Sequence, residues 1–161
     1  MADSHARIEF DDVSRRAPGV VSALRSLSAS AGEAGLEKPM IELVKLRASQ
    51  LNGCAFCIQF HLNLARKIGV PAEKLDLVPA WREAGLFSAR EQAALAWTEV
   101  MTRMAPGAAS EADYAALRAE FSESEALFLT VAIGTINQWN RIAVAFRFTP
   151  PVPKATEASA A

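Results

Sequence analysis

The sequence has few of the side chains that carry redox or proton chemistry near neutral pH. Among its 161 residues are only two cysteines and two histidines, the groups that most often titrate or react in that range. The formal net charge is −1 at pH 7, with 22% charged residues. This balance gives no electrostatic reason to expect nucleic acid or an anionic membrane as a partner. A glycine-rich nucleotide loop, strand-like alternation and an internal repeat are also missing.

The sequence also lacks a long hydrophobic run. The longest apolar stretch, 126–136, is too short to span a bilayer and is interrupted by Thr130, Gly134 and Thr135. The first residues, MADSHARIE, contain no apolar core of a signal peptide. We therefore expect a cytoplasmic protein. In that reducing compartment, a disulfide between the two cysteines would be a transient of turnover.

Both cysteines and one histidine fall in one short segment. Cys54, Cys57 and His61 follow one another at steps of three and four, so on an α-helix they share one face. Asn52-Gly53 is typical of a turn that ends one helix, and Cys54 would open the next, running to about Lys67. The start of a helix favours negative charge, which lowers a thiol's pKa. His61, one turn further on, can exchange protons with Cys57.

Three other interpretations of this segment have to be weighed. The cysteines could be inert, buried hydrophobes. Cys54, Cys57 and His61 could bind a metal with Glu42 as a fourth ligand, although a structural zinc site usually draws on a second Cys or His pair. A thioredoxin fold would need a strand before the motif. Residues 39–51 instead show apolar residues at helical spacing, so the pattern favours a dithiol on an all-α scaffold.

Helix signals follow one another along the rest of the chain. Pro18 and Pro39 are placed to start helices, the first of which should end by Gly32 or Gly35. Three capping boxes predict helices that end near residues 104, 121 and 146: Ser88-x-x-Glu91, Ser110-x-x-Asp113 and Ser122-x-x-Glu125. The last helix, 123–146, is apolar nearly all round, so we expect it to be buried on all sides, against the motif helix and across a subunit interface.

The chain is long enough for one domain with a sizeable core. We expect that domain to cover 18–149, preceded by a polar, irregular arm at 1–17 in which Ile8 and Phe10 contact the body. The proline- and alanine-rich tail, 150–161, is expected to be disordered.

Several single residues have a structural and a functional interpretation. Trp81 and Phe87 could wall a pocket over the dithiol, but ordinary packing is favoured. Arg47 is expected to pair with a structural acid, and Asn52 to shape the turn. Glu42 lies near a helix start, where an acid is favourable on dipole grounds alone. If it is buried beside the dithiol, its pKa would rise towards that of a useful general base.

These residues together resemble a known signature. Glu42, Cys54-x-x-Cys57 and His61, with Leu46-Arg47-x-Ser49-x-x-Asn52-Gly53 between them, are similar to the pattern of the alkylhydroperoxidase D-like (carboxymuconolactone decarboxylase) superfamily. Asn137-x-Trp139-Asn140-Arg141-Ile142, followed by Phe146-Arg147, resembles the last helix of these proteins. The resemblance covers most of residues 18–150.

The resemblance implies an all-α fold of six to eight helices, a cofactor-free peroxidase cycle and assembly into trimers or larger rings such as hexamers. By that pattern Cys57 reduces the hydroperoxide, Cys54 is the resolving thiol, and Glu42 and His61 relay protons. A thioredoxin-like or dithiol protein would be the reductant. The well-studied peroxidases of the family have a second histidine between the cysteines, where this chain has Phe56. That difference bears on how efficiently peroxide is turned over.

Two further functions stay open. One is a cofactor-free decarboxylase or isomerase acting on a small carboxylated lactone, with His61 and Glu42 as acid and base. The intact Cys-x-x-Cys counts against it, because the decarboxylase branch generally lacks this pair. The other is a non-enzymatic helical oligomer whose cysteines sense redox state or hold a metal.

Overall fold

The computed structural model describes residues 5–153, and all regular structure within this range is helical. This confirms the predicted all-α class. The elements in chain order are α1 (Phe10–Arg16), α2 (Pro18–Glu33), α3 (Lys38–Leu51), α4 (Ala55–Lys67), α5 (Ala72–Leu77), the 3₁₀ helix η1 (Val78–Ala80), α6 (Ala89–Arg103), α7 (Glu111–Arg118) and α8 (Glu123–Phe146). None of these helices is both long and apolar enough to cross a membrane.

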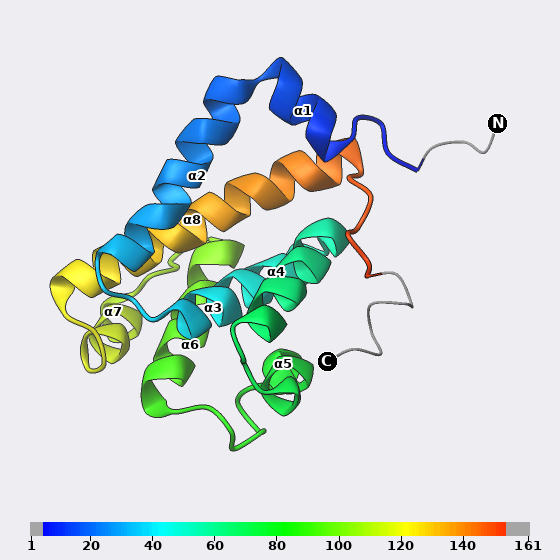
Figure 1. Ribbon diagram of the computed structural model, residues 1–161. Coiled ribbons are helices and arrows are strands. Elements are labelled where there is room, and N and C mark those ends of the chain that lie inside the picture. The colour runs from blue at the N-terminus through cyan, green and yellow to red at the C-terminus, as the bar shows by residue number, and fades with distance from the viewer. Residues whose placement is uncertain (1–4, 154–161) are drawn as a thin grey trace.

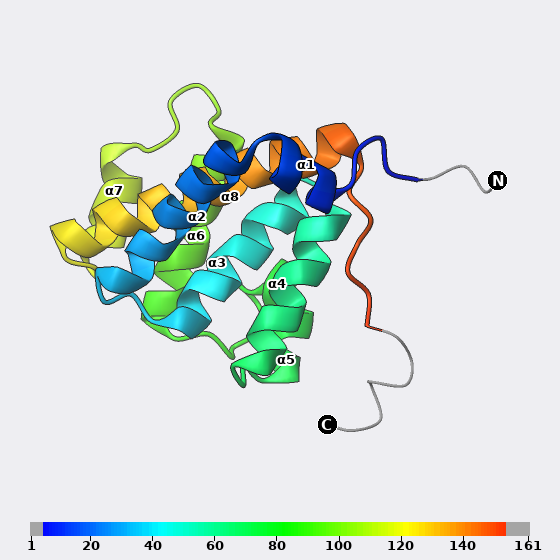
Figure 2. The same ribbon diagram turned by 45° about the horizontal axis from the view of Figure 1, so that its top comes forward.

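The long helix α8 lies at the centre of the arrangement. It packs against α2 on one side and against α3, α4 and α6 on the other (Figures 1 and 2). Helix α3 in turn contacts α4, α6 and α8. The C-terminal end of α3 and the N-terminal end of α4 therefore lie against α8. The cysteine motif lies where these three helices meet.

The side chains at that junction form an apolar cluster of their own. Cys54 and Cys57 are buried with Ile136 and Ala143 of α8 and with Phe148, which follows α8. Two larger clusters fill the rest of the interior, one around α2, α3, α6 and α8 and one beneath α5 and η1. The cysteines thus belong to the packed interior.

The prediction of an irregular arm at 1–17 is wrong for residues 10–16, which form α1. Helix α1 has only seven residues and no fully buried side chain, so its sequence gives little helical signal. Phe10 and Val13 pack on the cysteine cluster, and the backbone N–H of Arg7 donates to the carbonyl of Phe146 at 2.9 Å. Tertiary contacts therefore hold this segment to the end of α8, and Phe10 contacts the body as expected.

Most helix boundaries agree with the capping signals. All three predicted capping boxes form, although α7 ends at Arg118, short of the expected residue 121. At the C-terminal end, the predicted disordered tail lies largely outside the described residues. The described part of the tail lies against α4, where the Asn63 side-chain amide donates to the Pro151 carbonyl at 2.8 Å.

Helix α8 is not buried on all sides. Leu127 and Val144 are 61% and 49% exposed, because a single chain covers only part of its surface. The prediction that α8 also packs across a subunit interface stays a prediction.

A buried ion cluster joins α3, α6 and the segment after η1. The Glu99 carboxylate accepts hydrogen bonds from the Arg47 guanidinium at 2.6 and 2.9 Å, from the Trp81 indole at 2.9 Å and from Arg82 at 2.8 Å. Arg47 therefore pairs with a structural acid, as expected. Trp81 and Phe87 are buried in the packing cluster beneath α5 and η1. They therefore pack in the core, as favoured from the sequence, and do not line the cavity beside the cysteines.

The pKa of Glu99 reflects these contacts. Burial by itself would raise it, but the hydrogen bonds from Trp81, Arg82 and Arg47 outweigh burial and hold the pKa at about 2, below its usual value of 4.5. Since the folded-state pKa is depressed, this carboxylate stabilises the fold fully above pH 4.5. That contribution is lost as the pH falls towards 2.

We expect Glu99→Gln to lower the free energy of unfolding by about 3 kcal/mol at pH 7, because it leaves the buried Arg47 without its counter-charge. Chemical denaturation followed by circular dichroism measures the loss. The variant should also show a weaker fall in stability between pH 4.5 and 2. Glu83→Gln, at an exposed position in the same region, is the control. Equal stability of the two variants at pH 7 would contradict the role of this cluster.

Candidate active site

The turn between α3 and α4 sets the position of both cysteines. Asn52 caps the end of α3, and Gly53 adopts a left-handed φ of 63°, a conformation that glycine tolerates best. Cys54 then has extended backbone geometry and is the N-cap of α4, so the helix begins at Ala55, one residue later than predicted. Its sulfur accepts the backbone N–H of Cys57 at 3.3 Å. A sulfur atom therefore fills the place that Ser or Asp usually takes at a helix start.

The two thiols share their environment and influence each other's charge. Both are free and buried, with 1% of Cys54 and 4% of Cys57 exposed. A hydrogen bond from the Cys57 thiol lowers the pKa of Cys54, helped by the Cys57 N–H and by Asn140 and opposed by burial. The same thiol–thiol bond, together with burial, raises the pKa of Cys57. The lower pKa of the pair therefore belongs to Cys54, at the positive end of the α4 dipole.

Glu42 and His61 form a second pair next to the first. The Glu42 carboxylate of α3 lies 2.7 Å from Nδ1 of His61 on α4. Their side chains are only 12% and 8% exposed. An ionised Glu42 keeps the proton on Nδ1 and so leaves Nε2 of the imidazole as the atom for proton exchange. The structure thus joins two of the predicted site residues by direct contact.

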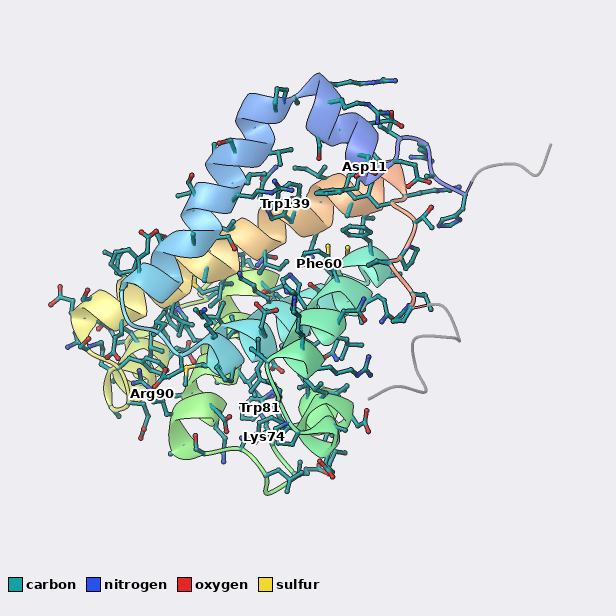
Figure 3. All side chains as sticks on the ribbon, in the orientation of Figure 1. Asp11, Phe60, Lys74, Trp81, Arg90 and Trp139 are labelled. Carbon is teal, nitrogen blue, oxygen red and sulfur yellow. The ribbon has the colours of Figure 1, made fainter. Side chains whose placement is uncertain are left out.

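Cys57 and His61 open onto one cavity of about 360 Å³. They lie one turn apart on the same face of α4, as predicted. The walls come from α1, α2, α3, α4 and α8 and are mostly apolar, with Phe60 of α4 and Trp139 of α8 among the lining residues (Figure 3). Cys54 and Glu42 do not line this cavity. Cys57 is therefore the thiol that a ligand in the cavity meets.

Phe56, which stands where the well-studied peroxidases have a second histidine, belongs to the cavity wall. Its ring stacks on Phe10 at 5.6 Å and on Phe60 at 6.0 Å between ring centres, and it meets the edge of Phe148 at 5.2 Å. This position therefore makes the cavity more apolar and supplies no proton carrier.

A buried amide network lies behind the cysteines. The Asn52 side chain donates to the side-chain oxygens of Asn137 at 2.9 Å and Asn140 at 2.8 Å, and Asn140 donates to Ser49 at 3.1 Å. Asn52 therefore does more than shape the turn. The effect of Asn140 on the thiols was not predicted from the sequence, although an asparagine in a nearly apolar helix was an available signal.

Sequence reasoning also missed Lys45. It lies one turn after Glu42 on α3, lines the cavity and is 7% exposed. Its ammonium group donates to the Ser28 hydroxyl at 2.6 Å. Burial lowers the pKa of Lys45, and the nearby Glu42 charge opposes that change. A lysine between apolar neighbours in the motif was the signal available in the sequence.

The four residues considered as metal ligands do not form one cluster. Within residues 5–153, the structure contains no group of three or more His, Cys, Asp or Glu side chains placed to hold a metal ion. The four residues considered as ligands are instead arranged as a thiol pair and a carboxylate–imidazole pair.

Comparisons with known proteins agree with this architecture. An uncharacterised protein from Bacillus subtilis, YdfG, is 33% identical over 129 residues, which cover 80% of this chain and 88% of YdfG. The crystal structure of a protein of unknown function from Agrobacterium tumefaciens, ATU0492, superimposes with a TM-score of 0.84 at 39% identity, covering 92% of this chain and 99% of that one.

More distant structures share the fold. The alkylhydroperoxidase AhpD core of a peroxidase-related protein from Ralstonia eutropha has a TM-score of 0.76 at 22% identity, over 89% of this chain and 80% of that chain. The debrominase Bmp8 has a TM-score of 0.75 at 17% identity, over 89% of this chain and 76% of that one. The model of the carboxymuconolactone decarboxylase family matches residues 18–100, and the chain belongs to this family within the alkylhydroperoxidase D-like superfamily.

Proposed function

We propose that the protein is a cofactor-free dithiol peroxidase that reduces organic hydroperoxides. The observation that carries this proposal is the combination of two free, buried thiols at the start of α4, where the Cys57 N–H donates to the Cys54 sulfur, with an apolar cavity onto which Cys57 opens. A carboxylate–imidazole pair borders the same cavity through His61. These are the parts that a two-thiol reduction of an O–O bond needs.

The reaction has three steps. The Cys57 thiolate attacks the terminal oxygen of the hydroperoxide, the O–O bond breaks, and the alkoxide takes a proton to leave as an alcohol. Cys57 is then a sulfenic acid. The Cys54 sulfur attacks the Cys57 sulfur, forms a disulfide and expels the oxygen as water. A thioredoxin-like or dithiol protein returns two electrons and two protons by thiol–disulfide exchange.

The charge distribution in the resting pair defines how the first step begins. The pKa of Cys54 is lowered and that of Cys57 is raised, so Cys57 is the thiol that keeps its proton more readily, yet Cys57 faces the cavity. Transfer of that proton to Cys54 turns Cys57 into the thiolate at the moment of attack. The proton then lies on Cys54, and it is removed when Cys54 attacks the sulfenic acid.

His61 and Glu42 supply and accept the remaining protons. Imidazole is the side chain best suited to this at neutral pH. Its Nδ1 is held by Glu42, which orients the ring and stabilises its protonated form after it takes up a proton. Glu42 acts through His61, because its carboxylate does not line the cavity.

The relatives support a peroxidase and also define the main alternative. The Agrobacterium protein's description proposes antioxidant defence of the AhpD type, and the Ralstonia structure is named a peroxidase-related alkylhydroperoxidase core. The family model is named for a decarboxylase. In a decarboxylase or isomerase, His61 and Glu42 would act as acid and base without the cysteines. Full activity on a lactone acid in the double Cys→Ser variant would favour that alternative.

We also propose that copies of the chain assemble into trimers or hexamers in the cytoplasm. Support comes from the apolar side chains that one chain leaves exposed on α2 and α8. They include Val20, Leu27, Leu127 and Val144. This assembly is a proposal independent of the chemistry at Cys57.

We expect Cys57→Ser to abolish peroxide consumption in an assay coupled to a dithiol reductant. Cys54→Ser should also stop turnover, but it should accumulate one sulfenic acid per chain after one equivalent of hydroperoxide, because no resolving sulfur remains. Trapping with dimedone and mass spectrometry measures the adduct. The two variants control for each other. An adduct on Cys54 in Cys57→Ser would reverse the assigned roles, and unchanged turnover in Cys57→Ser would rule out the mechanism.

Glu42→Gln should lower kcat/KM for hydroperoxide by about 100-fold, the lower end of what general acid–base catalysis contributes. The amide cannot stabilise a protonated His61 as the carboxylate does. The pH profile of kcat/KM should change as well, which a purely structural role would not cause. Glu33→Gln, an exposed acid on α2, is the matched control and should keep the original rate and pH profile. An equal loss in both variants would contradict a proton relay.

Asn140→Ala should raise the pKa of Cys54, because Asn140 is among the groups that lower it. Titration of the ultraviolet absorbance of the thiolate measures this shift. Asn137→Ala removes a neighbouring amide from the same network and is the control, since Asn137 does not act on the thiols. An unchanged thiolate titration in Asn140→Ala, or the same shift in both variants, would show that Asn140 does not tune the pair.

A further inference from the structure

The cavity beside Cys57 has a marked asymmetry of charge. Arg25, Lys45 and His61 line it, and no acidic residue does. The Glu42 carboxylate is engaged by His61 and lines an adjoining hollow that shares Lys45 with this cavity. The remaining walls are mostly aromatic or aliphatic. A ligand that matches this cavity has an apolar body and a negative group.

Lys45 is a buried cation with no carboxylate in direct contact, although the Glu42 charge acts on it from nearby. It is buried in the cavity wall, and its only side-chain hydrogen bond within residues 5–153 goes to the neutral hydroxyl of Ser28. An ammonium group has three donors, and a buried charge is normally paired with an opposite charge. None of the ion pairs in that part of the chain includes Lys45. An incoming carboxylate would supply both the counter-charge and an acceptor.

The second cation has a different position. Arg25 lies on α2, is exposed and lines the same cavity. It can attract an anion at the entrance without losing its hydration. Lys45, which is buried, can hold the anion after entry, where a charge-assisted hydrogen bond is stronger because water is excluded.

We propose that the cavity selects hydroperoxides that carry a carboxylate, with Lys45 binding the carboxylate while the apolar body packs on Phe56, Phe60 and Trp139 and the hydroperoxide reaches Cys57. The volume of about 360 Å³ is at the small end for ligand pockets. A medium alkyl chain or a single aromatic ring is therefore the fitting body. The proposal that the substrate is a hydroperoxide rests on the peroxidase function proposed above. The proposal that Lys45 binds a carboxylate does not depend on that function.

The first experiment measures turnover with a matched pair of substrates, a medium-chain fatty-acid hydroperoxide and its methyl ester. We expect KM for the acid to be about 10- to 100-fold lower than for the ester, the effect of one charge-assisted hydrogen bond. Lys45→Met, similar in length and apolar, should abolish that preference. Lys67→Met, at an exposed position at the end of α4, should keep it. Equal KM values for acid and ester, or a preference that survives in Lys45→Met, would overturn the proposal.

The second experiment separates this inference from the peroxidase chemistry. Calorimetric titration of the reduced protein with octanoate and with 1-octanol uses ligands that have no O–O bond. Octanoate should bind at least about 10-fold more tightly, and Lys45→Met should lose the difference while Lys67→Met retains it. Equal affinities would overturn the anion site even in an active peroxidase. Selective octanoate binding by a protein without peroxide turnover would instead refute the proposed function alone.

A loss of rate in Lys45→Met that is equal for the acid and the ester, with octanoate binding unchanged, would also contradict the proposal. It would assign Lys45 to the chemistry at Cys57 instead of to selection of the substrate. Circular dichroism of the three proteins checks that the variants are folded.

Discussion

Polar groups carried into a helical interior must find partners there, and this constraint organises the protein around its cysteines. An unpaired buried polar group costs several times what a single hydrogen bond contributes. Helix α8 brings Asn137 and Asn140 into the interior, and both bond to Asn52 at the end of α3. That pairing fixes the turn from which α4 starts. The same constraint at the other end of α3 pairs Glu42 with His61.

The site therefore depends on the packing of three helices that are distant in sequence. Helix α3 provides the carboxylate, α4 the thiols and the imidazole, and α8 the amide that acts on the thiol charges. The buried Glu99 cluster also fixes α3, because Glu99 of α6 binds Arg47 of α3. Helix α3 is thus secured by polar contacts on two sides and can present Glu42 at a constant position.

Local signals in the sequence predicted much of this arrangement. The capping boxes and the Asn52-Gly53 turn act over a few residues, so they place the helices well. The steps between Cys54, Cys57 and His61 predict a shared face for the same reason. Helix α1 was missed because it is held by long-range contacts of Phe10. Lys45 and Asn140 were missed because their roles depend on which residues of other helices lie opposite them.

The capping role of Cys54 has a consequence for the redox potential. In the reduced protein the Cys54 sulfur, whose lowered pKa favours the negatively charged thiolate, accepts the N–H of Cys57 and lies at the positive end of the α4 dipole. A disulfide sulfur carries no such charge and is a weaker acceptor. The helix start therefore stabilises the dithiol over the disulfide, which raises the reduction potential of the pair. In the proposed peroxidase cycle, such a disulfide would accept electrons readily, so a mild thiol donor would be enough to return the pair to the dithiol form.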